Sequence, residues 1–137
     1  MLVKEAMSRT VLTVVPEADL REAAALMVDN HVGCLVVAKK GKLEGIITER
    51  DIIKYFAEGG NVQGASVSDA MTGYVITVSP NAKIRAAVNL MNQYGIKKLI
   101  VTEGDTIAGI ITSTDVVRED PRRCRDIAVL RRDKNKG

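Results

Sequence analysis

The chain carries the same stretch of sequence twice, and this internal repeat limits its fold more than any other feature. Shifted by 64 positions, residues 3–54 align with residues 67–118 without a gap, and 19 of the 52 aligned pairs are identical. This agreement exceeds what unrelated segments of similar secondary structure share, so one supersecondary unit is used twice. The 137 residues accordingly divide into a first repeat, a linker, a second repeat and a basic tail, at residues 1–58, 59–64, 65–119 and 120–137.

Each repeat has a pattern that predicts the order strand–helix–strand–strand–helix. Short apolar runs predict the strands, and apolar residues at helical spacing predict the helices. In the first copy, strands are expected at 11–14, 35–38 and 43–47, and helices from Leu20 and over 50–58. In the second copy, strands are expected at 99–102 and 107–111, and helices from Ile84 and over 114–119. One unit of about 55 residues buries little surface, so we expect an α+β fold with two βαββα units packed sheet to sheet about a pseudo-two-fold axis. Clefts between the copies are then natural ligand sites.

The first helix of each repeat has an apolar stripe that must cover its sheet. The stripes are Leu20, Ala23, Ala24 and Met27 in the first copy and Ile84, Ala87, Val88 and Met91 in the second. Asp19 followed by Glu22 is a capping-box pattern, whereas the second copy has Lys83 and Ala86 there. Further apolar residues lie partly on other faces, namely Ala25, Leu26, Val28 and Leu90. A monomer of this size would expose too much apolar surface, so we expect a homodimer.

The motif Gly-Ile-Ile-Thr-x-x-Asp occurs at 45–51 and again at 109–115, where a strand is expected to end and a helix to begin. A helix start offers unpaired N–H groups and a partial positive charge to an anion. Glycine allows a ligand to approach the backbone, and an aspartate can accept the hydroxyl groups of a ribose. The same Thr-x-x-Asp spacing is close to a capping box, which would stabilise the helix start. Spacing alone leaves both roles open, and the two are compatible.

The composition argues against several other functions. With no Trp, one Phe and three Tyr, the chain has no aromatic platform for single-stranded nucleic acid. One His and two Cys, Cys34 and Cys124, argue against a metal site, a disulfide framework and a Ser-His-Asp triad. The sequence lacks the glycine-rich phosphate and dinucleotide motifs, so we expect neither an enzyme nor a catalytic cofactor. The longest apolar run, 23–28, is too short for a membrane helix, and we expect a cytoplasmic protein.

The doubled unit resembles a pair of cystathionine-β-synthase (CBS) domains, known as a Bateman module. The resemblance covers residues 1–119 and rests on Ala6-Met7, Thr13-Val14-x-Pro16, Ala23-x-x-Leu26-Met27 and 45–51, with their second copies. It implies βαββα units used in pairs, usually assembled as a homodimeric disc. It also implies binding of AMP, ADP or ATP, with S-adenosylmethionine or NAD as alternatives, and transmission of that signal to an unidentified regulated protein. The catalytic domain of cystathionine β-synthase has no counterpart in these residues.

The resemblance also assigns site residues. It places a ribose on an aspartate in each cleft: on Asp115 with Thr112 and Thr114, and on Asp51 with Thr48 and Arg50. Lys97 and Lys98 would bring ammonium groups to a phosphate. The equivalent residues of the first copy, Gly33 and Cys34, carry no such charge. From the residues alone, the lysine pair is equally consistent with a solvated basic pair at the start of a strand. We therefore expect tighter binding of phosphorylated ligands at Asp115. The opposite copy would supply each adenine pocket: Val32 and 4–10 for Asp115, and Ile96 and 68–74 for Asp51.

The tail departs from the family pattern. Residues 121–137 contain seven Lys and Arg and two Asp, a net charge of +5, which leaves −2 on residues 1–120 from the total of +3. The tail is either a solvated terminus, a segment that docks through 127–130, or a basic arm that binds nucleic acid. The acidic body opposes the last of these. Two functions therefore stand beside nucleotide binding: a ligand-free CBS scaffold, and a protein that acts on nucleic acid through its tail.

Overall fold

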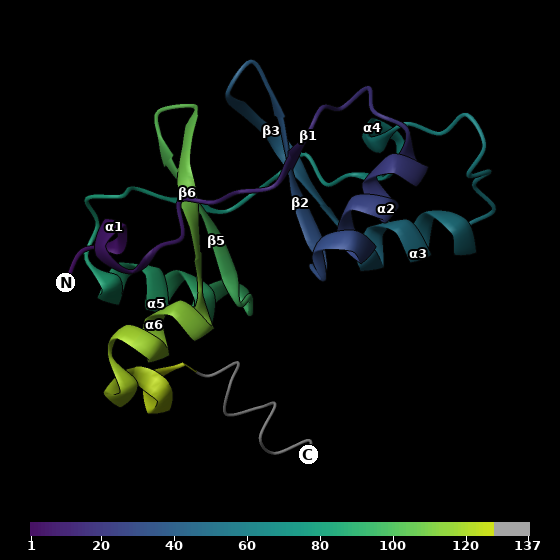
Figure 1. Cartoon of the computed structure of the whole chain (residues 1–137). Coiled ribbons are helices and arrows are strands. Elements are labelled where there is room, and N and C mark those ends of the chain that lie inside the picture. Colours follow the sequence, from purple (N-terminus) through teal and green to yellow (C-terminus); the bar gives the residue numbers. More distant parts are fainter. Residues whose placement is uncertain (128–137) are drawn as a thin grey trace. The chain divides into compact units, whose positions relative to one another are not determined.

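The computed structural model describes residues 1–127 of the chain (Figure 1). These residues form two compact units. One unit is continuous and runs from Val11 to Val75, whereas the other combines Met1–Thr10 with the chain from Ile76 onward. Each unit contains the order strand–helix–strand–strand–helix once. The predicted α+β class with βαββα units is therefore confirmed, and the packing of the two units against each other stays a prediction.

The continuous unit is a three-stranded sheet with two main helices. Its elements are β1 (Thr13–Val14), α2 (Leu20–Asn30), β2 (Cys34–Lys39), β3 (Lys42–Thr48), α3 (Glu49–Ala57) and α4 (Val67–Ala70). β2 pairs with β3 in antiparallel and with β1 in parallel orientation. The turn between β2 and β3 holds Lys40 at φ 54° and Gly41 at φ 78°, left-handed values that glycine adopts without strain.

The other unit repeats this arrangement and adds a helix at its end. Its elements are α1 (Val3–Ala6), β4 (Thr77–Val78), α5 (Ile84–Tyr94), β5 (Lys98–Glu103), β6 (Thr106–Thr112), α6 (Ser113–Glu119) and the 3-10 helix η1 (Pro121–Asp126). β5 pairs with β6 in antiparallel and with β4 in parallel orientation. The sequence pattern did not predict α1, α4 or η1. Within residues 1–127, no helix is both long and apolar enough to cross a membrane.

The two long helices, α2 and α5, bury the predicted stripes to different extents. All four stripe residues of α5 are buried, but Ala24 of α2 is only partly buried, whereas the equivalent Val88 is 3% exposed. Asp19 caps α2 by accepting a hydrogen bond from Arg21 N (2.8 Å), and Lys83 gives α5 no side-chain cap. The weaker start predicted for the second helix is therefore confirmed.

The short helix α1 packs in the unit that contains the second repeat, although it precedes the first repeat in the sequence. Val3 N donates a hydrogen bond to Ala82 O (2.8 Å). Further along, Ser8 N donates to Ile110 O (2.8 Å), and Ile110 N donates back to Ser8 O (2.9 Å). The segment that leads into the first repeat thus adds a helix and a short bridge to the other unit.

Helix α4 makes the reciprocal contacts in the continuous unit. Val67 N donates to Ala18 O (2.8 Å). Thr72 and Ile46 exchange two backbone hydrogen bonds, at 2.9 and 3.0 Å. The two sequence repeats have therefore exchanged their leading segments, and the compact units divide the chain differently from the repeats.

Each unit has its own hydrophobic core, and the exchanged helix contributes to it. The core of the continuous unit consists of Val14, Leu20, Ala23, Met27, Leu35, Val37, Ile47, Ala65 and Val67. The core of the other unit consists of Val3, Ala6, Val78, Ile84, Ala87, Val88, Met91, Leu99, Val101, Ile111, Val116 and Ile127. Because Val3 and Val67 have no exposed surface, loss of either short helix would open the core that it completes.

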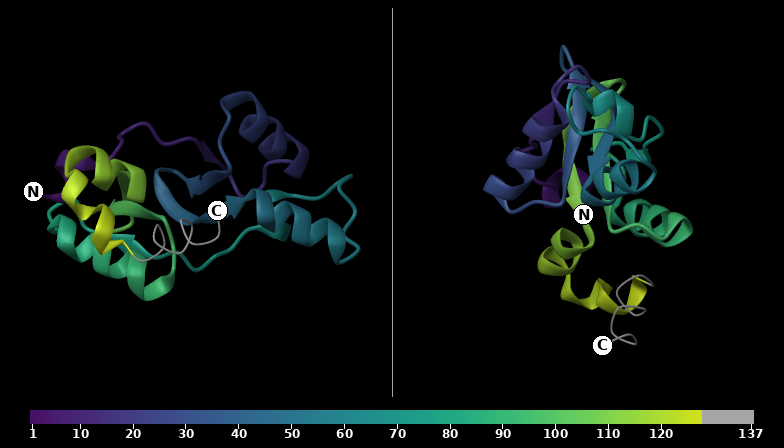
Figure 2. Two further views of the ribbon diagram at one scale, coloured as in Figure 1. Left: turned by 90° about the horizontal axis from the view of Figure 1, so that it is seen from below. Right: turned by 90° about the vertical axis from the view of Figure 1, so that its right-hand side faces the viewer.

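The beginning of the tail is folded, which corrects its interpretation as a solvated terminus. η1 follows α6 and lies beside it (Figures 1 and 2), and Ile127 is fully buried in the core. Asp120 accepts hydrogen bonds from the backbone and the side chain of Arg122, and the side-chain bond lowers the pKa of the Asp120 carboxyl. Docking is thus confirmed for Ile127, and residues 128–130 lie outside the described part of the chain.

Gly45→Ala should destabilise the protein, because the added Cβ would collide with the Thr72 carbonyl oxygen of the exchanged segment. Overpacking of this kind costs about 1–3 kcal/mol, seen as a lower midpoint of urea unfolding. Gly73→Ala is the matched control, since nothing lies within 4 Å of its added Cβ. An unchanged midpoint for Gly45→Ala would contradict the close packing of this segment on β3.

Candidate functional site

The two Thr-x-x-Asp motifs form the same structure at the starts of α3 and α6. Thr48 Oγ1 accepts a hydrogen bond from Asp51 N (3.1 Å), and Asp51 Oδ2 accepts one from Thr48 N (2.9 Å). Thr112 and Asp115 make the same two bonds at 3.0 and 2.9 Å. Both motifs are therefore capping boxes, as one interpretation of the spacing predicted. Each box uses Oδ2 of its aspartate and leaves Oδ1 for another partner.

The partner of Oδ1 differs between the two aspartates. Asp115 is 8% exposed, and its Oδ1 accepts a hydrogen bond of 2.7 Å from Arg118 Nη2 in a salt bridge. Asp51 is partly buried, and its Oδ1 accepts a long bond of 3.4 Å from Thr72 Oγ1. The residue equivalent to Arg118 in the first repeat is Lys54. A ligand hydroxyl would therefore compete with a strong charged partner at one aspartate and with a weak one at the other.

Arg118, the partner of the candidate residue Asp115, was missed by the sequence analysis. An acid and a base three residues apart on a helix lie on the same face and attract each other. The spacing of Asp115 and Arg118 on the predicted helix was therefore a usable signal. Thr72 was included only as part of the segment 68–74, and nothing in the sequence singled out its hydroxyl.

The lysine pair lies next to the start of α6. Lys98 is directly opposite Thr112 in the pairing of β5 with β6. The carbonyl of Lys97 accepts a hydrogen bond of 2.8 Å from Ser113 N. The structure thus brings the two cationic residues to the same end of the unit as Asp115, and the other unit has an uncharged pair in the same place, Gly33 and Cys34.

The exchanged segments run beside the motif strands. Ser8 forms a bridge to β6 and Thr72 to β3, so 4–10 shares a unit with Asp115, and 68–74 shares one with Asp51. A Cβ at Gly109 would lie 2.5 Å from Ser8 O. The motif glycines therefore make room for the exchanged backbone, which corrects the expectation that they make room for a ligand.

The remaining predicted site residues lie on the surface or against a core. Thr114 and Arg50 are exposed, each as the second residue of its helix. Val32 packs against the core of the continuous unit and Ile96 against that of the other. A contact of either residue with a ligand held by the opposite unit stays a prediction. Residues 1–127 contain no group of three or more His, Cys, Asp or Glu side chains placed to hold a metal ion.

Known proteins resemble the chain over most of its length. Residues 3–58 and 67–122 each match the CBS domain. The chain is 34% identical over 115 residues to the CBS domain-containing protein YhcV of Bacillus subtilis, a match that covers 83% of this chain and 81% of that protein. It is also 41% identical over 109 residues to inosine-5'-monophosphate dehydrogenase of Korarchaeum cryptofilum, but this match covers 79% of the chain and 22% of the enzyme.

A solved structure shares the fold of the whole pair. It is the CBS domain pair of protein MJ0100 in complex with 5'-methylthioadenosine and S-adenosyl-L-methionine, with a TM-score of 0.76 and 28% identity. The match covers 90% of this chain and 98% of that one. Since both repeats match the CBS domain separately, the chain belongs to the CBS domain family as a tandem pair of CBS domains.

Proposed function

We propose that the protein is a regulatory module that binds an adenine nucleotide (AMP, ADP or ATP) and passes the signal to a partner protein. The observation that carries this proposal is the carboxylate at each Thr-Asp helix start, whose Oδ1 lies outside the capping box. The related CBS pair of MJ0100 is in complex with two adenosine-containing ligands, which supports the same ligand class here. S-adenosylmethionine and NAD are the alternative ligands.

The site in the second repeat combines an acceptor with cations. Asp115 would accept ribose hydroxyls, and the phosphate would lie near Lys97 and Lys98 at the neighbouring strand start. The first turn of α6 adds hydroxyl groups from Thr112 and Thr114. Val32 of the other repeat would contact the adenine. This combination favours phosphorylated ligands, since hydrogen bonds to charged groups contribute about 1.5–3 kcal/mol each.

The site in the first repeat is built alike but has fewer cations. Asp51 would accept the ribose with Thr48 beside it, and Arg50 is the basic residue on the first turn of α3. Ile96 of the other repeat would contact the base. Because Asp51 Oδ1 has only a long bond to Thr72, a nucleoside would displace little to bind here.

A thermal-shift panel tests the proposal as a whole. It contains AMP, ADP, ATP, S-adenosylmethionine, NAD and 2'-deoxy-AMP, the last of which lacks a hydroxyl that the aspartate would accept. A ligand at about 100 times its Kd stabilises the fold by about 2.7 kcal/mol. We expect a shift with at least one ribonucleotide and a smaller one with 2'-deoxy-AMP. No shift with any ligand would favour the scaffold alternative.

Asp115→Ala should weaken AMP binding at the tighter site about ten- to a hundredfold, the equivalent of one charged hydrogen bond. Asp51→Ala should affect only the weaker site, and calorimetry separates the two. The control is Asp19→Ala, which removes the side-chain cap of α2 outside both sites. It accounts for the stability lost with a cap, about 0.5–2 kcal/mol. If Asp51→Ala abolishes binding at the tighter site and Asp115→Ala does not, the tighter site is the one at Asp51.

Arg118→Ala should strengthen binding of adenosine at the Asp115 site, because it frees Oδ1 from a salt bridge. The Arg118 side chain is 60% exposed, and exposed pairs contribute about 0.2–1 kcal/mol, so the gain is about 1.4- to fivefold. Lys54→Ala at the equivalent position is the control and should leave binding at Asp51 unchanged. Weaker adenosine binding in Arg118→Ala would show that Arg118 assists the ligand.

A further inference from the structure

Two adjoining hollows lie between α5 and the segment that runs from α6 into η1. Their volumes are about 490 and 590 Å³. Arg85 and Arg123 line both of them, so the two form one continuous depression, which we call the basic hollow. Five basic residues line it, namely Lys83, Arg85, Arg122, Arg123 and Arg125.

The acids beside the basic hollow already have partners. Asp120 Oδ1 lies 3.1 Å from Arg122 Nε, and Asp120 Oδ2 lies 3.6 Å from Arg123 Nε. Asp126 Oδ2 lies 3.6 Å from Arg123 Nη1. The carboxylate of the third acid, Glu119, lies 3.8 Å from the guanidinium of an arginine outside the lining. These acids balance Arg122 and Arg123 but not the other three basic residues of the hollow.

The three remaining cations have no acidic partner nearby. Lys83, Arg85 and Arg125 form no ion pair within residues 1–127. Lys83 and Arg85 belong to the start of α5, and Arg125 belongs to η1, so positive charge lines the hollow on both sides. Like charges around one concave surface raise its potential. An anion held between them would relieve their mutual repulsion.

The η1 side of the basic hollow is anchored to the unit. Ile127, directly after η1, is fully buried in the core, and Asn92 Nδ2 donates a hydrogen bond of 2.9 Å to Asp126 O. Asp120 accepts a bond of 3.3 Å from Arg122 N. The arginines of η1 therefore project from a fixed backbone, which lowers the entropy cost of binding a ligand. Their planar guanidinium groups match the paired oxygens of a phosphate.

The charge of the chain is divided unequally between the two compact units. The continuous unit, residues 11–75, contains six Lys and Arg and nine Asp and Glu, a net charge of −3. The described part of the other unit, residues 1–10 and 76–127, contains ten and seven, a net charge of +3. The net −2 of residues 1–120 therefore hides a basic unit, and this unit carries the basic hollow. Its field attracts anions from solution.

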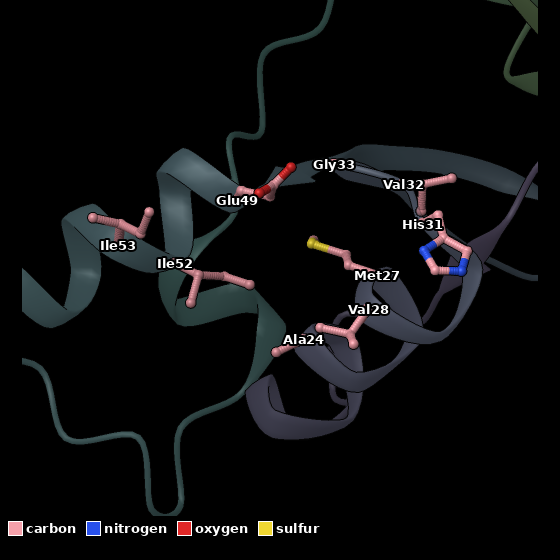
Figure 3. A pocket seen from close by; sticks show the side chains of 9 residues that line it. All are labelled: Ala24, Met27, Val28, His31, Val32, Gly33, Glu49, Ile52 and Ile53. Atoms are coloured by element: carbon pink, nitrogen blue, oxygen red, sulfur yellow. The ribbon is translucent and has the colours of Figure 1, made fainter.

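A similar space in the continuous unit lacks basic residues. The pocket between α2 and α3, of about 520 Å³, is lined mainly by carbon, with Glu49 as its one acid and no Lys or Arg. Figure 3 shows Met27 directed into this pocket, with Ile52 on the opposite side. Val28 of this pocket corresponds to Asn92 of the basic hollow. The positive charge is thus a property of the second repeat and its tail, and not of the shared fold.

We infer that the basic hollow binds an anion that carries two or more phosphate groups, at a place separate from the proposed nucleotide sites. One phosphate group has a charge of about −1.5 to −2, which does not balance three unpaired cations, whereas two or more groups do. Lys97, Lys98 and Asp115 line neither of the two hollows. The inference is therefore independent of nucleotide binding at the Thr-Asp helix starts.

Calorimetry of the full chain with inorganic tripolyphosphate at low ionic strength tests the site. We expect binding that weakens as salt is added, because the cations are exposed. The double variant Arg85→Ala, Arg125→Ala removes one unpaired cation from each side and should weaken binding about tenfold or more. Substitution of exposed residues changes stability little, so an unchanged urea midpoint is the check on folding. No binding to the full chain would overturn the inference.

The matched control removes the same charge from the continuous unit. Arg21 is the counterpart of Arg85, and Lys42 is an exposed residue of β3. Arg21→Ala, Lys42→Ala therefore lowers the net charge of the chain equally and leaves the hollow unchanged, and it should keep its tripolyphosphate binding. Equal weakening in both double variants would reveal attraction to net charge alone and would overturn the site. Full binding in Arg85→Ala, Arg125→Ala would place the anion elsewhere, with the same consequence.

The same two double variants identify the source of the phosphate groups. If ATP loses a binding event in Arg85→Ala, Arg125→Ala and adenosine binding is unchanged, the triphosphate of a nucleotide enters the hollow. If only tripolyphosphate loses binding, the ligand is a free polyphosphate. Both results support the basic hollow as the site. Failure of adenosine and AMP to bind at all would contradict the proposed nucleotide sites and would leave the tripolyphosphate result standing.

Discussion

Each compact unit depends on a short helix that the chain supplies from the other repeat. Val3 and Val67, the first residues of α1 and α4, have no exposed surface. Each completes the hydrophobic core formed by the other repeat. To make this exchange the chain passes between the units after residue 10 and again after residue 75. Neither repeat can complete its core alone, and a cut between the two repeats would separate each unit from its short helix.

This exchange explains why the internal repeat predicted the βαββα units but did not predict which residues belong to which compact unit. A shift of 64 residues makes Val3 equivalent to Val67, but equivalence does not say which copy either residue contacts. Helices of four residues are also too short to show a helical period. The motif glycines were the available sign of a close backbone contact, and their neighbour is the exchanged segment and not a ligand.

At the candidate site, local spacing predicted local structure and little more. Thr-x-x-Asp is a contact between residues three apart, so its capping box followed directly from the sequence. The bond from Thr72 to Asp51 joins residues 21 apart and depends on how α4 docks. Charge counting left the interpretation of the tail open, because a net charge does not show that Ile127 can bury its side chain while Asp120 and Asp126 pair with the neighbouring arginines.

Helix α3 connects the candidate nucleotide site with an apolar groove of the same unit. Its first turn holds Asp51 in the capping box, and Ile52 and Ile53, the next two residues, line the groove between α2 and α3. A rigid helix of nine residues cannot move at one end alone. If a nucleotide on Asp51 favours one position of α3, any occupant of the groove that favours the same position binds more tightly, and it raises the nucleotide affinity by the same factor. In the other unit, the first turn of α6 holds the equivalent Asp115, and the helix is followed directly by η1, so a ligand there would act first on η1.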